Sequence, residues 1–369
     1  MKKLIEPSVK LLPYQAEGVG HLLRQPHGGL LMDPGTGKTV VVLSSYFQLF
    51  KRGAIDLLIV VAPVRVCYEV WPAEVEKWGF PYQCYVLHEH RKDATLASAF
   101  ESKAKLPTVL IVNYDGLEWF LPYLTQLRKK WQRIWFVADE STKIKHTSTQ
   151  RFKTLKPYLP MFARRTILTG TPSPNGLEDL FGQVYACDLG SRLGQYITQY
   201  RREYFYPSGY QGYKWTPQPD AEERIYKTLD GMFYRVSDDV LKLPPIHHVD
   251  VFVELPTKAR KLYEKLEDEF IVELQGTTVT AANAAVLTSK LRQVANGILY
   301  GAENTIAVHD AKLNALDDLV EDLQGNPLLV GYEYTADGER IAKAHKAPMI
   351  SKMRPKEVTE TLGKFNRGE

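Results

Sequence analysis

The sequence predicts an α/β protein with two lobes built on parallel sheets, and three observations support this fold class. Five short, unbroken apolar runs read as strands buried on both faces: GLLM (29–32), LLIVVAP (57–63), TVLIVNY (108–114), RIWFVADE (133–140) and RTILTGTP (165–172). Amphipathic segments such as VCYEVWPAEVEKW separate the runs, and this alternation is typical of a parallel sheet covered by helices. Three of the runs end in polar or glycine-rich residues, at the edge where open parallel sheets bind ligands.

The bulk properties fit an ordinary globular protein. A chain of 369 residues suggests two domains, and its formal net charge of +4 permits a nucleic-acid partner without requiring one. The three cysteines form no C-x-x-C pair, so we expect no disulfide framework and a reducing cytoplasm. The apolar runs are far shorter than the ~20 residues of a membrane span, so no membrane partner is expected.

Changes in composition along the sequence divide the chain into two lobes. We place a first lobe at 1–240, interrupted by an aromatic and basic stretch at about 191–219, and a second lobe at 241–369. In the second lobe, periodic runs predict helices at 257–274 and at about 280–294. The apolar run NPLLVGYEY (326–334) predicts a further buried strand.

The segment DPGTGKT, between the first apolar run and the helix-like VVVL, predicts a phosphate-binding loop. Its glycines let the backbone curl so that the amides of 35–39 face an anion at a helix amino terminus. Lys38 is expected to reach the β- and γ-phosphates, and the Thr39 hydroxyl to bind Mg²⁺. The candidate nucleotide ligands in the loop are Gly35, Thr36, Gly37, Lys38 and Thr39.

One position departs from the general phosphate-loop pattern. Met32 stands where that pattern has a glycine or, in some families, an alanine. The alternative to a phosphate loop is a plain strand–helix turn that happens to contain G-T-G-K-T. The strand–loop–helix context favours the phosphate loop.

Two later strand ends carry residues suited to the same chemistry. Asp139 and Glu140 follow an apolar strand, where a carboxylate can hold Mg²⁺ and its neighbour can accept a proton from the attacking water. Taken alone, Asp139 is more simply explained as a helix cap, and the phosphate loop upstream favours the magnesium role. Thr169 and Thr171 flank Gly170 at a third strand end, where their hydroxyls can bond the Glu140 carboxylate. A Thr-Gly turn is the simpler alternative.

Together these segments resemble a known family. PYQAEGV, MDPGTGKT, VVAPVRVCYEVWPAEVEKW, VNYDGL, VADEST and LTGTPSPNGLEDLF stand in the order typical of superfamily-two helicases. The closest resemblance is to the Swi/Snf-type DNA translocases, in the short form found in phage and bacterial genomes. FYRVSDDVLKLPP resembles that family's link between lobes, and LRQVANG and LLVGYEY resemble parts of its second lobe. The resemblance implies two RecA-like P-loop lobes.

The resemblance also implies roles for individual residues. Tyr14 and Gln15 are placed at the adenine, and Thr169 and Thr171 are expected to couple the nucleotide state to lobe motion. The residues placed against the DNA backbone are Pro63, Val64, Arg65, Asn113 and Tyr114. The implied cofactors are ATP and Mg²⁺, and the implied partner is duplex DNA contacted without regard to sequence, in a bacterial or phage-infected cell. No protein partner is implied.

Two functional hypotheses follow. The family's sixth motif, Q-x-x-G-R-x-x-R, supplies arginines to the γ-phosphate, and the arginines after Gly331 (Arg340, Arg354 and Arg367) lie in no such pattern. An arginine finger contributes ~10³–10⁵ in rate, so we expect a second lobe that is incomplete and a chain that hydrolyses ATP poorly alone. The first hypothesis is an ATP-driven translocase, intact or cut short. The second is a DNA-binding module gated by nucleotide.

The aromatic and basic stretch has two interpretations. In the first, Arg201 and Arg202 contact DNA phosphates as part of a protrusion. In the second, the rings of this stretch pack on the first lobe as a small core.

Overall fold

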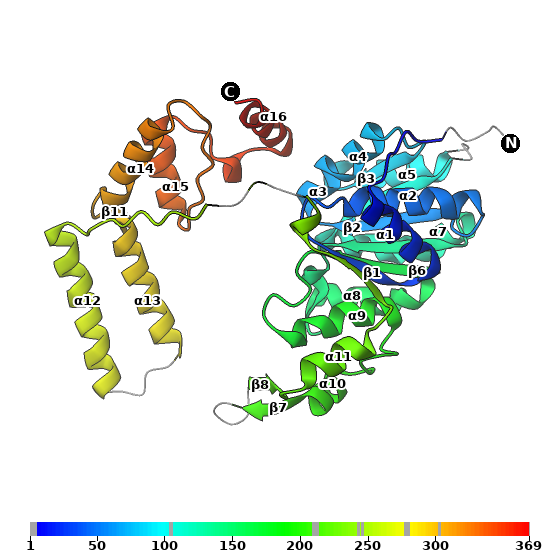
Figure 1. Ribbon diagram of the computed structural model, residues 1–369, viewed down its shortest axis with the longest axis horizontal. Helices are drawn as coiled ribbons and strands as arrows, with labels where there is room; N and C mark the ends of the chain where they lie inside the picture. Colours follow the sequence, from blue (N-terminus) through cyan, green and yellow to red (C-terminus); the bar gives the residue numbers. More distant parts are fainter. Residues whose placement is uncertain are drawn as a thin grey trace. The chain divides into compact units, whose positions relative to one another are not determined.

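The computed structural model describes residues 6–102, 106–208, 214–241, 244, 247–276, 281–301 and 304–368. The chain divides into two compact units, Met1–Pro244 and Pro245–Glu369 (Figure 1). The described residues contain no helix that is long and apolar enough to cross a membrane. Cys67, Cys84 and Cys187 are all free thiols.

The first unit is built on a seven-stranded sheet in the order β3-β4-β2-β5-β6-β1-β9. All neighbouring strands pair in parallel. The strands are β1 (His27–Met32), β2 (Leu57–Ala62), β3 (Gln83–Leu87), β4 (Thr108–Asn113), β5 (Ile134–Asp139), β6 (Arg164–Thr169) and β9 (Phe233–Val236). The five predicted strands are therefore confirmed as β1, β2, β4, β5 and β6, and the α/β fold class with them.

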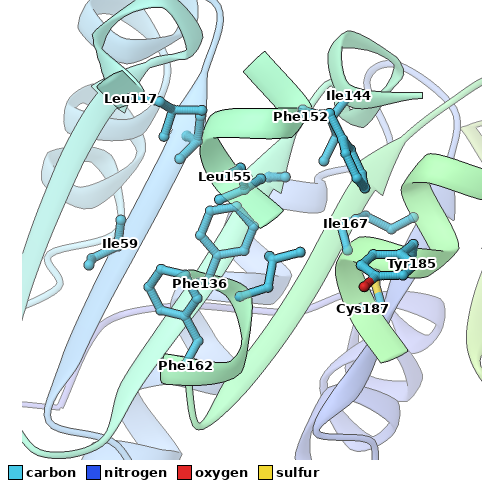
Figure 2. Close-up of a cluster of buried hydrophobic side chains, with 14 of the residues drawn as sticks. Ile59, Leu117, Phe136, Ile144, Phe152, Leu155, Phe162, Ile167, Tyr185 and Cys187 are labelled. Atoms are coloured by element: carbon cyan, nitrogen blue, oxygen red, sulfur yellow. The ribbon is translucent and has the colours of Figure 1, made fainter. Parts of the chain in front are cut away.

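Helices cover both faces of this sheet, because successive side chains of a strand point to opposite faces. Leu58 and Val60 of β2 pack with α1 (Pro13–Arg24), α2 (Lys38–Lys51), α3 (Val64–Glu69) and α4 (Trp71–Lys77) in one buried cluster. Ile59 packs in a second cluster on the other face, together with α5 (Lys92–Glu101), α6 (Leu117–Phe120), α7 (Leu124–Lys130), α8 (Gln150–Leu155) and α9 (Leu180–Asp188). In this second cluster the rings of Phe136 and Phe162 stack with centroids 4.9 Å apart (Figure 2).

The aromatic stretch folds onto the second cluster. It forms α10 (Ile197–Tyr204) and the hairpin of β7 (Phe205–Ser208) and β8 (Lys214–Pro217), and α11 (Ala221–Thr228) follows it. Tyr200, Tyr204 and Phe205 are buried, and the Tyr200 hydroxyl donates to the Leu177 carbonyl over 2.8 Å. These three rings are thus core residues, as the second interpretation has it. Residues 209–213 of the stretch lie outside the described residues.

The segment that resembles a link between lobes begins as a strand. β9 runs beside β1, with Gly29 opposite Phe233 and Met32 opposite Val236. The Asp33 amide donates to the Val236 carbonyl over 3.1 Å, and the Asp238 amide donates to the Asp33 carboxylate over 3.0 Å. The start of this segment is therefore fixed to the first residue of the predicted phosphate loop.

The second unit is mainly helical in the part that the structure describes. Its helices are α12 (Thr257–Gly276), α13 (Ala281–Asn296), α14 (Ala311–Asp322), α15 (Thr335–His345) and α16 (Pro355–Asn366). β10 (Ile298–Tyr300) and β11 (Thr305–Ala307) form an antiparallel hairpin. The two predicted helices are confirmed as α12 and α13.

The strand predicted at 326–334 is wrong. Residues 326–332 form neither helix nor strand, and Leu329 is 65% exposed. An apolar run becomes a buried strand only where a neighbouring strand supplies hydrogen-bond partners and a packed face. In the described part of this unit, the β10–β11 hairpin does not pair with this segment.

Candidate active site

Three loops meet at one edge of the sheet because β5, β6 and β1 are adjacent parallel strands. Asp139 pairs with Leu168, and Leu31 pairs with Thr169, so the three strands end at nearly the same level. The loops that follow them carry the predicted phosphate loop, the acidic pair and the Thr-Gly-Thr turn. The fold thus brings together segments separated by more than a hundred residues.

The phosphate loop has the backbone that its glycines allow. Gly35 and Gly37 have φ of +82° and +88°, in the left-handed region that a Cβ atom disfavours. Gly37 is the cap of α2, which begins at Lys38 and is 14 residues long. Thr36 is fully buried, and its hydroxyl donates to the Asp33 carbonyl over 2.6 Å. The loop therefore ends at a helix amino terminus, where an anion is favoured.

Lys38 points back across this loop. Its Nζ donates to the carbonyls of Met32, over 2.7 Å, and of Asp33, over 3.3 Å. Burial lowers the pKa of Lys38, while the charges of Asp139 and Glu140 act in the opposite direction. Lys38 consequently lies within electrostatic reach of the acidic pair.

Met32 is compatible with this loop. It is the last residue of β1, and its side chain is fully buried in the cluster that α1 to α4 cover. Its carbonyl oxygen accepts the hydrogen bond from Lys38 Nζ. The departure from the general pattern is therefore accommodated by the core.

The amino terminus of α1 packs against the same loop. The Gln15 amide nitrogen donates to the Thr36 carbonyl over 3.0 Å, and its oxygen accepts from the Leu12 amide over 3.0 Å. A Cβ atom on Gly37 would lie 2.5 Å from that amide nitrogen. Tyr14 is partly buried, and its carbonyl accepts from the Tyr234 hydroxyl over 2.9 Å. A role for Tyr14 and Gln15 at the adenine stays a prediction.

Asp139 accepts hydrogen bonds on both oxygens of its carboxylate and on its main-chain carbonyl. The Trp71 indole nitrogen donates to Oδ2 over 3.0 Å, and the Glu140 amide donates to Oδ1 over 3.1 Å. The Tyr114 hydroxyl donates to the main-chain carbonyl of Asp139 over 2.7 Å. Burial raises the pKa of this carboxyl to about 6, although the Trp71 hydrogen bond and the Lys38 charge lower it. The carboxylate is thus fixed in orientation and only 6% exposed.

Glu140 has a strained backbone. Its φ of +53° and ψ of 56° lie in the left-handed region, which is disfavoured for a residue with a side chain by about 1–2 kcal/mol. Strain of this kind clusters at functional sites. Because Glu140 follows the last residue of β5, this conformation lies directly beside Asp139.

The Thr-Gly-Thr turn packs on the phosphate loop. A Cβ atom on Gly170 would lie 3.0 Å from Pro34 Cδ, and the Thr169 hydroxyl accepts from the Thr171 amide over 3.2 Å. Among the described residues we find no hydrogen bond from Thr169 or Thr171 to Glu140. Their coupling role stays a prediction.

A buried polar network joins the acidic loop to this turn and was not predicted. The Ser141 hydroxyl donates to the Gln183 side-chain oxygen over 2.6 Å, and the Gln183 amide nitrogen donates to the Pro172 carbonyl over 2.6 Å. Ser141 and Gln183 are 42 residues apart, and both are fully buried. The sequence carries no periodic or motif signal for this pair.

The residues at this edge fit a magnesium nucleotide. The Thr39 hydroxyl and the Asp139 carboxylate are the hard oxygen ligands that Mg²⁺ prefers, and loop amides with Lys38 suit phosphates. In the described part of the chain, no group of three or more His, Cys, Asp or Glu side chains is arranged to hold a metal ion. Mg²⁺ in nucleotide sites is usually bound by one or two protein ligands together with substrate phosphates.

The residues predicted to contact DNA fall into two groups. Pro63 caps α3, which begins at Val64, and Arg65 is exposed there in an ion pair with Glu69 over 2.8 Å. Asn113 and Tyr114, in contrast, are only 6% and 4% exposed. Their side chains are packed inside the unit, and a contact of these two residues with a DNA backbone stays a prediction.

The two arginines of the aromatic stretch also differ. Arg201 forms an ion pair with Glu178, and its guanidinium lies 5.4 Å from the centre of the Trp215 ring. Arg202 is exposed. Arg202 is therefore the better candidate for a phosphate contact.

Comparison with known proteins identifies the family. The SNF2-related domain model matches residues 14–298. Protein p41 of Acyrthosiphon pisum secondary endosymbiont phage 1 is 32% identical over 94% of this chain and 77% of its own length. The CHD3-type chromatin-remodeling factor PICKLE of Arabidopsis thaliana is 25% identical over 87% of this chain. An ATP-dependent helicase of Mycoplasma pneumoniae is 28% identical over 84% of it.

This chain spans only 25% of the plant protein and 29% of the Mycoplasma protein. Among solved structures, the Sulfolobus solfataricus SWI2/SNF2 ATPase core in complex with dsDNA aligns with 98% of this chain and 77% of that one. The TM-score is 0.51 at 19% identity, which shows a shared fold. The phosphate loop, the acidic pair and the family match agree, and the chain belongs to the SNF2-related domain family of helicase-like ATPase motors.

Proposed function

We propose that this chain is a motor that uses ATP and Mg²⁺ in its first unit to move along duplex DNA. The observation that carries the proposal is the convergence of Lys38, Asp139 and Glu140 at the ends of β1 and β5, the two strands that flank β6. Phosphoryl transfer needs a cradle for phosphate, a carboxylate for the cation and a base for water, and these residues supply all three.

The chemistry follows from the positions of these groups. The amides at the start of α2 and the Lys38 ammonium bind the phosphates, and Thr39 with Asp139 holds Mg²⁺. When bound, Mg²⁺ neutralises charge on the phosphates and orients them. Glu140 accepts the proton of the attacking water on its carboxylate. Thr169 and Thr171 lie on a turn that packs against the phosphate loop. They are therefore suited to couple the presence or absence of the γ-phosphate to motion of the lobes.

Duplex DNA is the proposed track. The structural match to an ATPase core solved with dsDNA supports this, as does the exposed position of Arg65 and Arg202. Contacts to phosphates suit a motor that ignores base sequence. We place the activity in the cytoplasm of a bacterial or phage-infected cell, because the three thiols are free and p41 is a phage protein.

A second candidate is a nucleotide-gated DNA-binding module without efficient hydrolysis. It is favoured by Arg340, whose guanidinium is engaged inside the second unit by Asp310 and by the His309 carbonyl. An arginine finger contributes ~10³–10⁵ in rate, so without one this chain would turn ATP over slowly.

ATP turnover measured with and without duplex DNA separates the two candidates. A motor shows turnover that DNA stimulates, whereas a gated module binds ATP and does not turn it over. Lys38→Ala should abolish ATP binding, and Glu140→Gln should keep binding and lose turnover. Lys51→Ala, at the far end of α2 in a surface pair with Glu6, is the control and should behave as wild type. Full turnover in Glu140→Gln would refute the assigned base.

A further inference from the structure

We propose that Trp71 and Tyr114 are positioning residues that link the segments proposed to contact DNA, after β2 and β4, to the magnesium-binding carboxylate. The proposal rests on the function proposed above and adds a route by which DNA contact reaches the nucleotide. The two residues come from different segments, after β2 and after β4, yet both donate a hydrogen bond to Asp139. The strand order β4-β2-β5 places these segments next to one another.

The two hydrogen bonds restrain Asp139 in complementary ways. Trp71 holds one carboxylate oxygen, over 3.0 Å, while Tyr114 holds the main-chain carbonyl, over 2.7 Å. With the Glu140 amide on the other carboxylate oxygen, the plane of the carboxylate cannot turn without breaking a hydrogen bond. Trp71 and Tyr114 are themselves buried, so water cannot readily replace either donor. Groups that orient a metal ligand in this way typically change metal affinity 10–100-fold when they are removed.

The connection to DNA runs through a short stretch of chain. Arg65 lies on α3, which ends at Glu69, and Trp71 is the first residue of α4. Cys67, between Arg65 and Trp71, is buried and donates to the Ala62 carbonyl at the end of β2. Because only Val70 separates α3 from α4, a displacement of α3 by a bound phosphate backbone would move the indole that holds Asp139. By linkage, Mg²⁺-nucleotide must change DNA affinity by the same factor.

The chain supplies matched controls for a test. Trp71→Phe keeps an aromatic ring and removes the N–H donor. Trp135 is also fully buried in the same cluster, but its indole donates to the Thr166 hydroxyl over 2.9 Å, so Trp135→Phe removes an equivalent donor away from Asp139. Tyr114→Phe is matched by Tyr46→Phe, because the buried Tyr46 hydroxyl donates to the Thr108 carbonyl over 2.9 Å.

The experiment measures binding of a fluorescent ATP analogue by the full chain as Mg²⁺ is titrated, with and without duplex DNA, and again in EDTA. Trp71→Phe should raise the Mg²⁺ concentration for half-saturation about 10-fold and leave nucleotide binding in EDTA unchanged. It should also abolish the effect of DNA on the Mg²⁺ requirement. Tyr114→Phe should shift the requirement in the same direction, and both control variants should match wild type.

The outcomes distinguish the two proposals. If wild type binds nucleotide without any dependence on Mg²⁺, the proposed function fails, and this inference fails with it. If wild type shows that dependence and Trp71→Phe shifts it no more than Trp135→Phe does, only the positioning role is overturned. If Trp71→Phe does not fold, the comparison of Tyr114→Phe with Tyr46→Phe replaces it, because Tyr114→Phe removes only one oxygen atom. A Mg²⁺ requirement that is the same in these two variants would then overturn the positioning role.

Discussion

Replacing Gly37 by alanine is expected to destabilise the first unit through two separable effects. The left-handed φ of +88° costs an alanine about 1–2 kcal/mol. In addition, the new Cβ atom would lie 2.5 Å from the Gln15 amide nitrogen, which breaks the hydrogen bond to the Thr36 carbonyl and costs about 0.5–1.5 kcal/mol. The free energy of unfolding should therefore fall by about 1.5–3.5 kcal/mol.

Gly35→Ala is the matched variant. Its φ of +82° imposes similar strain, but its Cβ atom would meet only Leu241 Cδ1 at an ordinary 3.4 Å. The predicted loss is about 1–2 kcal/mol, from strain alone. The second contact of a Gly37 Cβ atom, with Val40 Cγ1 at 3.3 Å, is close to the 3.4 Å contact at Gly35. The difference between the two variants therefore reports mainly the contact of Gln15 with the phosphate loop.

Urea unfolding followed by tryptophan fluorescence measures both losses in the relevant unit. The six tryptophans all lie in the first unit: Trp71, Trp78, Trp119, Trp131, Trp135 and Trp215. In a Gln15→Ala background the clash is gone, so Gly37→Ala should cost no more than Gly35→Ala. Equal urea midpoints for the two glycine variants in the wild-type background would refute the argued role of Gln15.

Three further predictions concern the core, the pH dependence and the DNA surface. Phe136→Ala should lower the free energy of unfolding by about 3–5 kcal/mol in the same urea assay, because Phe136 is only 1% exposed. Burial, with the charge of Arg165, lowers the pKa of His27 to about 4. As the pH falls from 6.5 toward 4, His27 therefore takes up a proton in the unfolded chain but not in the folded one, and the free energy of unfolding decreases. Since His27 is half-buried, that loss is about 1–2 kcal/mol, and a His27→Gln variant that keeps the same pH slope would contradict it. Arg202→Ala should weaken duplex binding and flatten its dependence on salt, while the ion-paired Arg201→Ala should not, as measured by fluorescence anisotropy at several salt concentrations.

Local signals made the centre of the sheet and the phosphate loop predictable. β1, β2, β4, β5 and β6 are continuous apolar runs, and Gly35 and Gly37 are needed wherever the backbone curls in this way. The edge strands β3 and β9 were not predicted, because their residues are largely half-exposed. Arg235 interrupts the apolar residues of β9, and the apolar run of β3 is the short CYVL (84–87). The false strand at 326–334 shows the converse, since apolar residues alone do not supply a pairing partner.

Contacts between residues that are far apart in the sequence could not be predicted from it. Tyr114 was assigned to DNA, yet it is buried and bonded to Asp139, 25 residues away. The hydrogen bond from Trp71 to Asp139 spans 68 residues, and no spacing rule connects an indole to a carboxylate at that distance. Both contacts depend on the order in which strands assemble, which is a property of the whole sheet.

The pairing of β9 with β1 has a mechanical consequence. The chain leaves the first unit through β9, and β9 is bonded to the strand that leads into the phosphate loop. Tension directed along β9 loads its hydrogen bonds to β1 together, in shear, whereas tension across it opens them one after another. Force transmitted along the chain from the second unit therefore acts on the strand that leads into the phosphate loop, with a resistance that depends on the direction of the pull.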